Sequence, residues 1–217
     1  MSTETPDTAD DEVSRLEVRA LSAERLSFFA DAVIAIAITL LALELPKPEG
    51  TTNAELLHSV GVHRGDYIAF LISFLVIGSH WAAHQRVFRY VTSVSGGLIR
   101  LSLAWLLMQV LTPFATKVLA DEGAFQFRFT FYAGVQVAAF GLFLLMAWQL
   151  RRQGLIRPDT PSDMFMRLNI GAGAMAIGFA VSIPVAFFTE RAYAFWIVVP
   201  FLSGFVMRIK ERRKTAR

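Results

Sequence analysis

The sequence predicts an all-α integral membrane protein with six transmembrane helices and both termini in the cytoplasm. Hydrophobic residues make up 54% of the 217 residues, and only 18% are charged, against roughly a quarter in an average soluble domain. The charged residues fall mainly between long apolar runs. Because a helix of about 20 residues spans the hydrocarbon core of a bilayer, six runs are expected to cross it: 26–45, 67–88, 98–117, 129–150, 165–189 and 191–207.

The segments between and around these spans are short. Residues 1–24 are polar and acidic, which predicts a cytoplasmic tail that is disordered or loosely helical. The membrane domain is expected to cover 25–207, and its longest loop, 46–66, has room for a short amphipathic turn near 54–60. The basic segment 208–217 is predicted to form a second cytoplasmic tail, which leaves no residues for a soluble catalytic domain.

The orientation follows from the distribution of basic residues. Of the 21 Lys and Arg residues, sixteen fall on the side of the membrane that holds both termini and five on the opposite side. An excess of Lys and Arg marks the cytoplasmic side of a membrane protein. The same clustering between apolar runs accounts for the net charge of +3 without a nucleic-acid partner.

Several classes of chemistry find no support in the sequence. The chain has no cysteine, which excludes disulfides, thiol nucleophiles and cysteine-ligated metals. His80 and His84 have the spacing of a zinc-binding helix, but Trp81 stands where such a helix carries its glutamate. We therefore expect neither an enzyme nor a bound metal or organic cofactor.

The last two spans carry small and polar residues and prolines. Asn169 is expected to form an interhelical hydrogen bond. Pro200 is expected to kink the sixth span, and Pro184 either kinks the fifth span or lies near its end. Small side chains allow helix backbones to approach closely. The fifth span therefore has a predicted close-packing surface, formed by Gly171, Gly173, Ala174 and Gly178.

The first span is unusual because it contains a carboxylate. Asp31 lies in an apolar run, where an ionised group is costly unless it is paired or hydrated. On a helical wheel of about 100° per residue, Ile36, Leu40 and Leu43 form one apolar stripe. Thr39 lies on the flank of this stripe, and Asp31 faces away from it. The wheel leaves open whether the stripe faces lipid or a pore, and whether Asp31 binds another helix or a passing ion. The candidate partners of Asp31 in the second span are His80, Trp81, His84 and Gln85.

The first span also carries a longer signature. The stretch RLSFFAD, from Arg25 to Asp31, is followed by AVIAIAITLLALEL and resembles the first-helix motif of the transmembrane protein 175 family of potassium channels. Arg25, Phe29 and Asp31 match that motif, whereas Ala30 replaces its serine. Further matching residues follow, with Gln85 in place of a second histidine: Ser73, Phe74, Trp81, His84, Phe88, Pro113 and Phe114. These motifs lie within 25–117, beyond which only hydropathy supports the likeness.

The resemblance implies a potassium-permeable channel in the plasma membrane, formed by a homotetramer around a central pore that the first helix lines. Ile36, Leu40 and Leu43 occupy the positions of the family's hydrophobic constriction, and Thr39 matches a threonine implicated in selectivity. The residues that the resemblance implies hold the first helix in place are Arg25, Phe29, Asp31, Trp81 and His84. The permeant ion is K⁺, and no cofactor is implied.

Two other functions remain open from the sequence. A small secondary transporter or proton-coupled exchanger would use Asp31 and His84, and His84 would then be the natural proton-sensitive group. A membrane scaffold without transport of its own would leave both residues in structural contacts. Ion flux into liposomes separates the three, because a channel leaks quickly, a transporter exchanges slowly and a scaffold does neither.

Overall fold

The computed structural model describes residues 7–196, 198, 199, 202 and 204. Apart from one isolated β-bridge, the regular elements within these residues are helices. They are α1 (Asp7–Leu43), α2 (Asn53–Val62), α3 (Arg64–Phe88), α4 (Gly96–Ala120), α5 (Phe125–Arg152), α6 (Met164–Ala186) and the short 3₁₀ helix η1 (Glu190–Tyr193).

Five helices in the described part of the chain are long and apolar enough to cross a membrane: the Leu21–Leu43 segment of α1, and α3, α4, α5 and α6. The prediction of an all-helical, multi-span membrane protein is therefore confirmed. The predicted sixth span, 191–207, starts in η1, and its described residues after η1 are helical: 194–196, 198, 199, 202 and 204. The rest of this span, including Pro200, and the predicted tail 208–217 lie outside the described residues. Helix α1 starts at Asp7, so the described part of the predicted N-terminal tail is helical and continuous with the first span.

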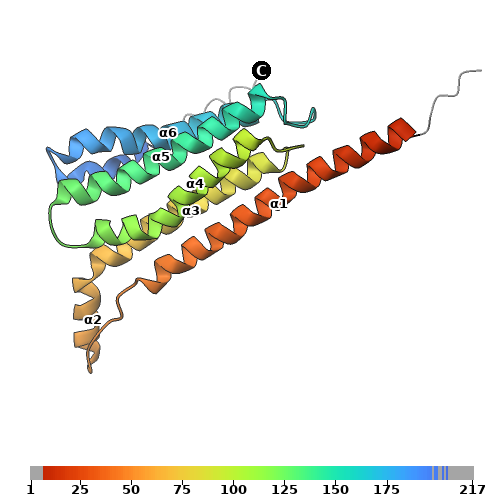
Figure 1. The fold of residues 1–217 in the computed structure, drawn as a ribbon. Helices are drawn as coiled ribbons and strands as arrows, with labels where there is room; N and C mark the ends of the chain where they lie inside the picture. Colours follow the sequence, from red (N-terminus) through yellow and green to blue (C-terminus); the bar gives the residue numbers. More distant parts are fainter. Residues whose placement is uncertain (1–6, 197, 200–201, 203, 205–217) are drawn as a thin grey trace, which may run out of the picture.

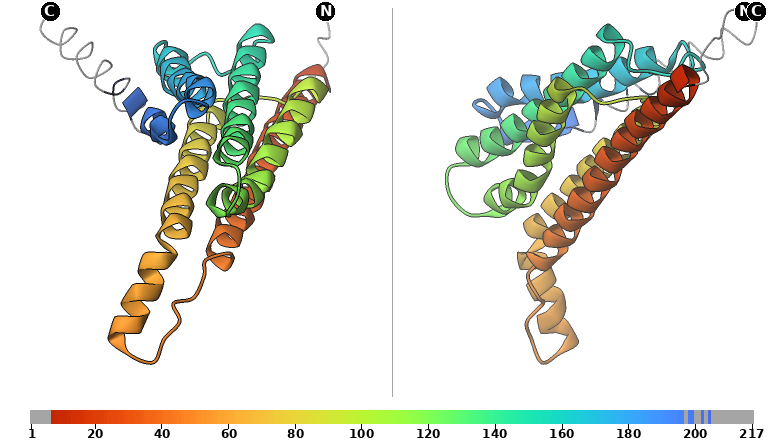
Figure 2. Two further views of the ribbon diagram at one scale, coloured as in Figure 1. Left: turned by 90° about the vertical axis from the view of Figure 1, so that its left-hand side faces the viewer. Right: turned by 45° about the vertical axis from the view of Figure 1, so that its right-hand side comes forward.

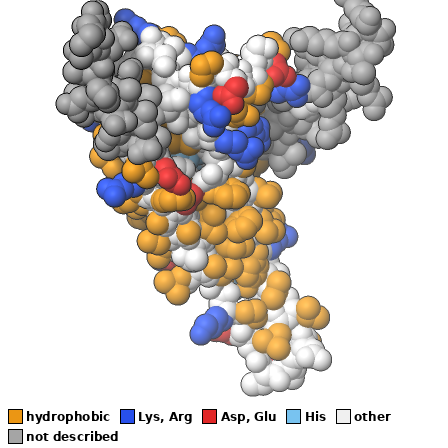
Figure 3. Space-filling view, turned by 90° about the vertical axis from the view of Figure 1, so that its right-hand side faces the viewer, with side chains coloured by type: hydrophobic (Ala, Val, Ile, Leu, Met, Phe, Trp, Pro, Cys, Tyr) orange, Lys and Arg blue, Asp and Glu red, His pale blue; other side chains and the backbone are white. Residues whose placement is uncertain are grey.

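The helices lie roughly alongside one another in a layered bundle (Figure 1). Helix α1 lies at one edge and contacts α3 and α4, while α4 contacts α5 and α5 contacts α6. Helix α2 projects from the start of α3 away from the rest of the bundle (Figure 2). One face of the molecule carries charged side chains toward one end, above a broad area of hydrophobic side chains (Figure 3), as expected for a protein that crosses a bilayer.

The turn expected near 54–60 is present as α2, and its start is well defined chemically. The Thr52 hydroxyl accepts a hydrogen bond from the Glu55 backbone N–H at 3.3 Å, and the Glu55 carboxylate accepts one from the Thr52 backbone N–H at 3.3 Å. This reciprocal pair is a capping box, which satisfies two backbone donors that a helix start leaves free. Hydrogen bonds from the backbone and side chain of Thr51 also lower the pKa of Glu55 below its ordinary value.

Aromatic side chains fill the core on the side of the bundle away from α1. Trp196, just after η1, stacks on Phe129 of α5 with ring centroids 4.7 Å apart and lies 5.0 Å from the ring of Phe179 in α6. A Cβ on Gly178 would lie only 3.2 Å from the backbone oxygen of Phe195. The predicted close packing of the fifth span is therefore confirmed at Gly178.

Two other glycines of the predicted close-packing surface are not closely packed in the described structure. A Cβ added to Gly171 or Gly173 would meet no described atom within 4 Å. Pro184 lies in the last turn of α6, two residues before its end, so it coincides with the end of the helix.

Two interhelical loops are joined at the end of the bundle where α3 and α5 finish. Val91 and Ile156 form the isolated antiparallel bridge. The backbone N–H of Thr92 donates to the oxygen of Leu155 at 3.0 Å, and that of Arg157 donates to the oxygen of Tyr90 at 2.9 Å. The loop after α3 therefore holds the loop after α5 in place.

Candidate functional site

The four residues predicted to line a pore share an outward-facing side of α1. Ile36, Leu40 and Leu43 are 60%, 39% and 78% exposed, and Thr39 is exposed beside them. No other part of the described chain covers this stripe of large apolar side chains. In a membrane protein, such a surface faces lipid, another protein chain or a pore.

The opposite side of α1 is packed tightly against α3 and α4. From Ala30 onward its buried residues recur at steps of three and four, the spacing of one helix face, and they are Ala30, Ile34, Ala37 and Leu41. The two alanines in this group allow α1 to approach its neighbours closely. The Leu21–Leu43 segment is nevertheless the most apolar and least buried of the five spans in the described residues. Most of its apolar surface is therefore available for contacts outside the subunit.

The hydroxyl oxygen of Thr39 is positioned to act as a ligand for a cation on the exposed side of α1. Its hydroxyl donates a hydrogen bond to the backbone oxygen of Ile36, one turn earlier, at 2.8 Å. Since the hydroxyl proton is engaged within the helix, the lone pairs of the Thr39 oxygen remain free to face outward. A cation beside this helix would meet an oxygen atom at that level and apolar side chains at Ile36 and Leu40.

Asp31 forms the link between α1 and α3. Its carboxylate oxygen Oδ1 accepts a hydrogen bond from Trp81 Nε1 at 3.0 Å and another from Gln85 Nε2. Two of the four candidate partners in the second span thus bind it. At the other end of the span, Lys117 of α4 forms an ion pair with Glu44, just after α1, with Nζ and Oε2 2.7 Å apart. These two contacts fix the rotation of α1 about its own axis.

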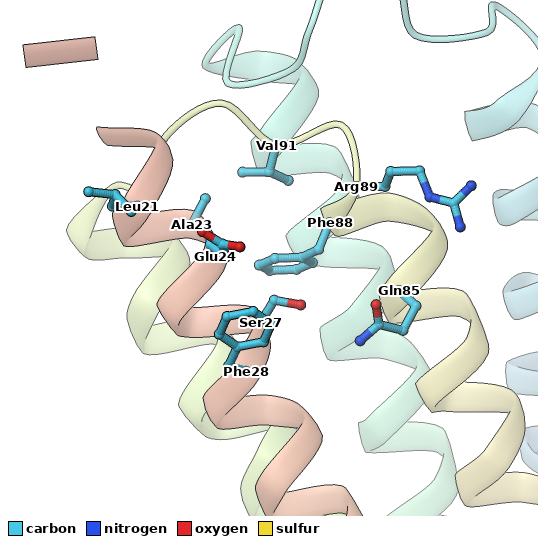
Figure 4. A pocket seen from close by; sticks show the side chains of 9 residues that line it. All are labelled: Leu21, Ala23, Glu24, Ser27, Phe28, Gln85, Phe88, Arg89 and Val91. Carbon is cyan, nitrogen blue, oxygen red and sulfur yellow. The ribbon is translucent and has the colours of Figure 1, made fainter. Parts of the chain in front are cut away.

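Arg25 and Phe29, which the sequence grouped with Asp31, are both exposed on the subunit. Among the described residues Arg25 makes no side-chain hydrogen bond or ion pair, so it is not joined to Asp31. Nearby, a hollow of about 630 Å³ separates the N-terminal half of α1 from the end of α3 (Figure 4). Phe88 points toward α1 across this hollow, and Arg89 turns away from it.

His84 lies on a different side of α3 from Trp81 and is buried. Its ring stacks between Phe88 and Trp105, with centroid distances of 3.9 and 4.9 Å. Neither ring nitrogen has a hydrogen-bond partner among the described residues. The structure therefore brings Trp81 to Asp31 but keeps His84 within the subunit core.

His80 is also a core residue. Its ring stacks on Phe140 with centroids 4.0 Å apart, and its Nδ1 atom lies 3.4 Å from the Trp105 Nε1 donor. Within the part of the chain that the structure describes, no group of three or more His, Cys, Asp or Glu side chains is arranged to hold a metal ion.

Sequence reasoning missed a line of buried polar side chains that joins α3, α4 and α5. The Ser73 hydroxyl donates to the Tyr132 hydroxyl at 3.0 Å and accepts from Thr116 at 2.7 Å. Further along α4, Thr112 accepts from the Gln136 amide at 3.3 Å. The signal was present, because Gln109, Thr112 and Thr116 follow one another at helical spacing in an apolar run. This line supplies packing specificity. Ser73 bonds to the hydroxyls of Tyr132 and Thr116 and not to a histidine, lysine or carboxylate, so these contacts do not activate it as a nucleophile.

Comparisons with known proteins bear on this site. The family profile described as endosomal/lysosomal potassium channel TMEM175 matches residues 25–113. The chain is 34% identical over 170 residues to a potassium channel of Streptomyces collinus, an alignment that covers 75% of this chain and 82% of that protein. It is 32% identical over 123 residues to a potassium channel of a Chryseobacterium strain, covering 57% of this chain and 58% of the relative.

A solved structure is also similar. It is the crystal structure of a lysosomal potassium-selective channel TMEM175 homolog from Chamaesiphon minutus, with a TM-score of 0.66 and 25% sequence identity. The superposition covers 86% of this chain and 97% of that chain. The similarity in fold therefore extends well beyond the segment that carries the first-helix motif.

Proposed function

Since this chain belongs to the TMEM175 family of potassium channels, we propose that four copies of it form a passive K⁺ channel in the plasma membrane. In this proposal α1 of each copy lines a central pore, and Ile36, Leu40 and Leu43 form its hydrophobic constriction. Thr39 contributes to ion selectivity. The channel uses no cofactor, and the ion that passes is its only substrate.

One observation carries the proposal: the most apolar span in the described residues is also the least buried, and it lies at the edge of the bundle. A helix in that position has one side free for contact with other copies. A single subunit that contributes one lining helix cannot enclose a pore, which favours a ring of copies. The stripe on α1 is then the surface that meets at the symmetry axis.

The length of the stripe sets the physics of passage. Seven residues separate Ile36 from Leu43, which corresponds to about 10 Å along the helix axis. An apolar ring of this length offers an ion almost no ligands, so passage depends on how much water the ion sheds. That cost is lower for K⁺ than for the more strongly hydrated Na⁺, and apolar constrictions also gate by dewetting.

The transporter alternative is less well supported by the geometry. It needs Asp31 and His84 to act on one substrate or proton. Asp31 accepts hydrogen bonds from Trp81 and Gln85, whereas His84 is enclosed by Phe88 and Trp105. The two groups therefore serve separate contacts.

Conduction and selectivity are tested by reversal potentials in bilayers and K⁺ flux into liposomes. Ile36→Asn is expected to hydrate the constriction, which raises the flux and weakens discrimination against Na⁺, and Thr39→Ala is expected to weaken discrimination alone. The matched control is Ile177→Asn in α6, since Ile177 is 61% exposed and Ile36 is 60% exposed. The control should behave as the unmodified protein. Unchanged selectivity in both Ile36→Asn and Thr39→Ala would refute the proposed pore.

Assembly is tested separately, and the absence of native cysteine makes the test clean. Native mass spectrometry should give a mass of four chains. Leu43→Cys, treated with a short bifunctional maleimide, should give covalent dimers, because each thiol reacts once. Ile177→Cys should stay monomeric under the same treatment. Cross-linking of Ile177→Cys but not of Leu43→Cys would mean that α6, and not α1, lies at the interface.

A further inference from the structure

Two hollows meet where α5 ends and α6 begins. One, of about 720 Å³, lies beside the loop after α5, and the other, of about 670 Å³, lies along the last turns of α5. Arg151 and Asn169 line both hollows. The sequence led us to expect an interhelical hydrogen bond from Asn169, but its side chain is exposed between the two hollows instead.

The arginines at this end of the bundle fall into two kinds. Arg157 is paired with Asp159 at 3.0 Å, and Arg167 is paired with Asp163 at 2.7 Å. Within the described chain, Arg151 and Arg152 have no carboxylate partner. Their positive charges therefore remain available to an anion from outside the subunit.

Aromatic rings hold both of these arginines in place. The guanidinium of Arg151 lies over Phe165, 5.2 Å from the ring centroid, and that of Arg152 lies over Trp148 at 5.1 Å. A guanidinium carries five N–H donors, and a contact between its charge and a ring engages none of them in a hydrogen bond with another side chain. The two side chains are thus ordered before any ligand arrives, which lowers the entropy cost of binding.

The surroundings of the two arginines are those of an amphiphile. Trp148 is exposed, as is Leu145 about one turn earlier in α5, and Met166 is exposed on α6. Tryptophan at the end of a membrane helix marks the headgroup level. Polar donors for a phosphate therefore lie next to apolar surface for acyl chains, and a free phosphate would use only the first of these.

We propose that the two hollows, together called the notch below, bind an anionic phospholipid. Its phosphate contacts Arg151, Arg152 and the Asn169 amide, and an acyl chain lies along Trp148. Basic residues between membrane helices bind anionic headgroups in this way on the cytoplasmic side, which is the side that the distribution of Lys and Arg assigns to these arginines. The bridge between Val91 and Ile156 fixes one wall of the notch. The site is independent of the pore.

The test measures retention of phosphatidylglycerol or phosphatidylcholine by the full chain in native mass spectrometry. The unmodified protein should prefer phosphatidylglycerol at least tenfold, and Arg151→Gln with Arg152→Gln should lose that preference, since each basic contact contributes a factor of roughly five. The matched control is Arg157→Gln with Arg167→Gln, which removes two arginines already paired with carboxylates and should keep the preference. Thermal unfolding without lipid identifies a variant that has lost its fold. If the double Gln variant has lost its fold, the retention measurement is repeated with Arg151→Lys and Arg152→Lys, which keep both charges and should keep the preference for phosphatidylglycerol.

Two results would overturn the assignment. One is equal preference for phosphatidylglycerol in the double Gln variant and the unmodified protein, when both are folded. The other is retention of glycerol phosphate or inorganic phosphate as strong as the retention of phosphatidylglycerol, because a soluble anion makes no use of the apolar wall.

Discussion

The link between Asp31 and Trp81 allows a quantitative prediction about how α1 is held. A hydrogen bond to a charged group contributes about 1.5–3 kcal/mol, whereas interhelical hydrogen bonds in membranes average about 0.6 and reach about 1.7 kcal/mol. Trp81 is 46% exposed on the subunit, which favours the lower part of the charged range. We expect a coupling energy of about 1.5 kcal/mol, roughly a tenfold change in the unfolding equilibrium.

The measurement is a double-mutant cycle of Asp31→Asn and Trp81→Phe, followed by unfolding in mixed micelles with increasing SDS. Asp31→Ala should cost more than Asp31→Asn, because it leaves the donors of both Trp81 and Gln85 without an acceptor. The comparison cycle is Glu44 with Lys117, an exposed ion pair for which about 0.2–1 kcal/mol is usual. A coupling for Asp31 and Trp81 that does not exceed the one for Glu44 and Lys117 would refute the reasoning.

Three further predictions concern other parts of the fold. Gly178→Ala should be less stable than Gly171→Ala by about 1 kcal/mol in thermal unfolding, because a Cβ at Gly178 is crowded and crowding offsets the usual gain of about 1 kcal/mol from replacing a helical glycine. Ser73→Ala should cost about 1–2 kcal/mol in the same assay by breaking buried hydrogen bonds to α4 and α5, and Ser79→Ala, whose hydroxyl bonds only within α3, should cost less. Because the pKa of Glu55 is lowered in the folded chain, its capping contribution is present above the ordinary value of 4.5 and is lost as the pH falls through the folded value. Hydrogen exchange at the start of α2, corrected for intrinsic rates, should rise on acidification in the unmodified protein and not in Glu55→Gln.

Hydropathy predicted the spans well because the bilayer imposes one length on every helix that crosses it. The run 98–117 lies inside α4, and 129–150 lies inside α5. The ends were less predictable, because a helix continues past the hydrocarbon wherever its residues still favour it. Polar residues before Arg25 do not break the helix, so α1 begins at Asp7 instead.

The contacts of α3 show what a single sequence does not reveal. Trp81 and Gln85 are about 40° apart on the wheel, and His84 is turned about 60° from Trp81 in the opposite direction. All three are within one turn and all were candidates for Asp31. Only the position of α1 decides that Trp81 and Gln85 meet the carboxylate while His84 enters the core, and that position depends on packing far along the chain.

The same geometry connects the anchoring of α1 to the proposed pore. With Ile36 at zero on the wheel, the buried side of α1 lies between about 100° and 160° and Asp31 at about 220°. Glu44 follows the last residue of α1, and continuing the wheel by one position would place it at about 80°. Asp31 and Glu44, which form the contacts that fix the rotation of α1, therefore lie on either side of the buried face. Neither lies on the exposed stripe. Turning the helix by one residue position, about 100°, would break both contacts at once. The direction of the stripe is thus determined within each subunit before any copies meet, and a change at Asp31 would redirect Ile36 without altering a single side chain of the proposed lining.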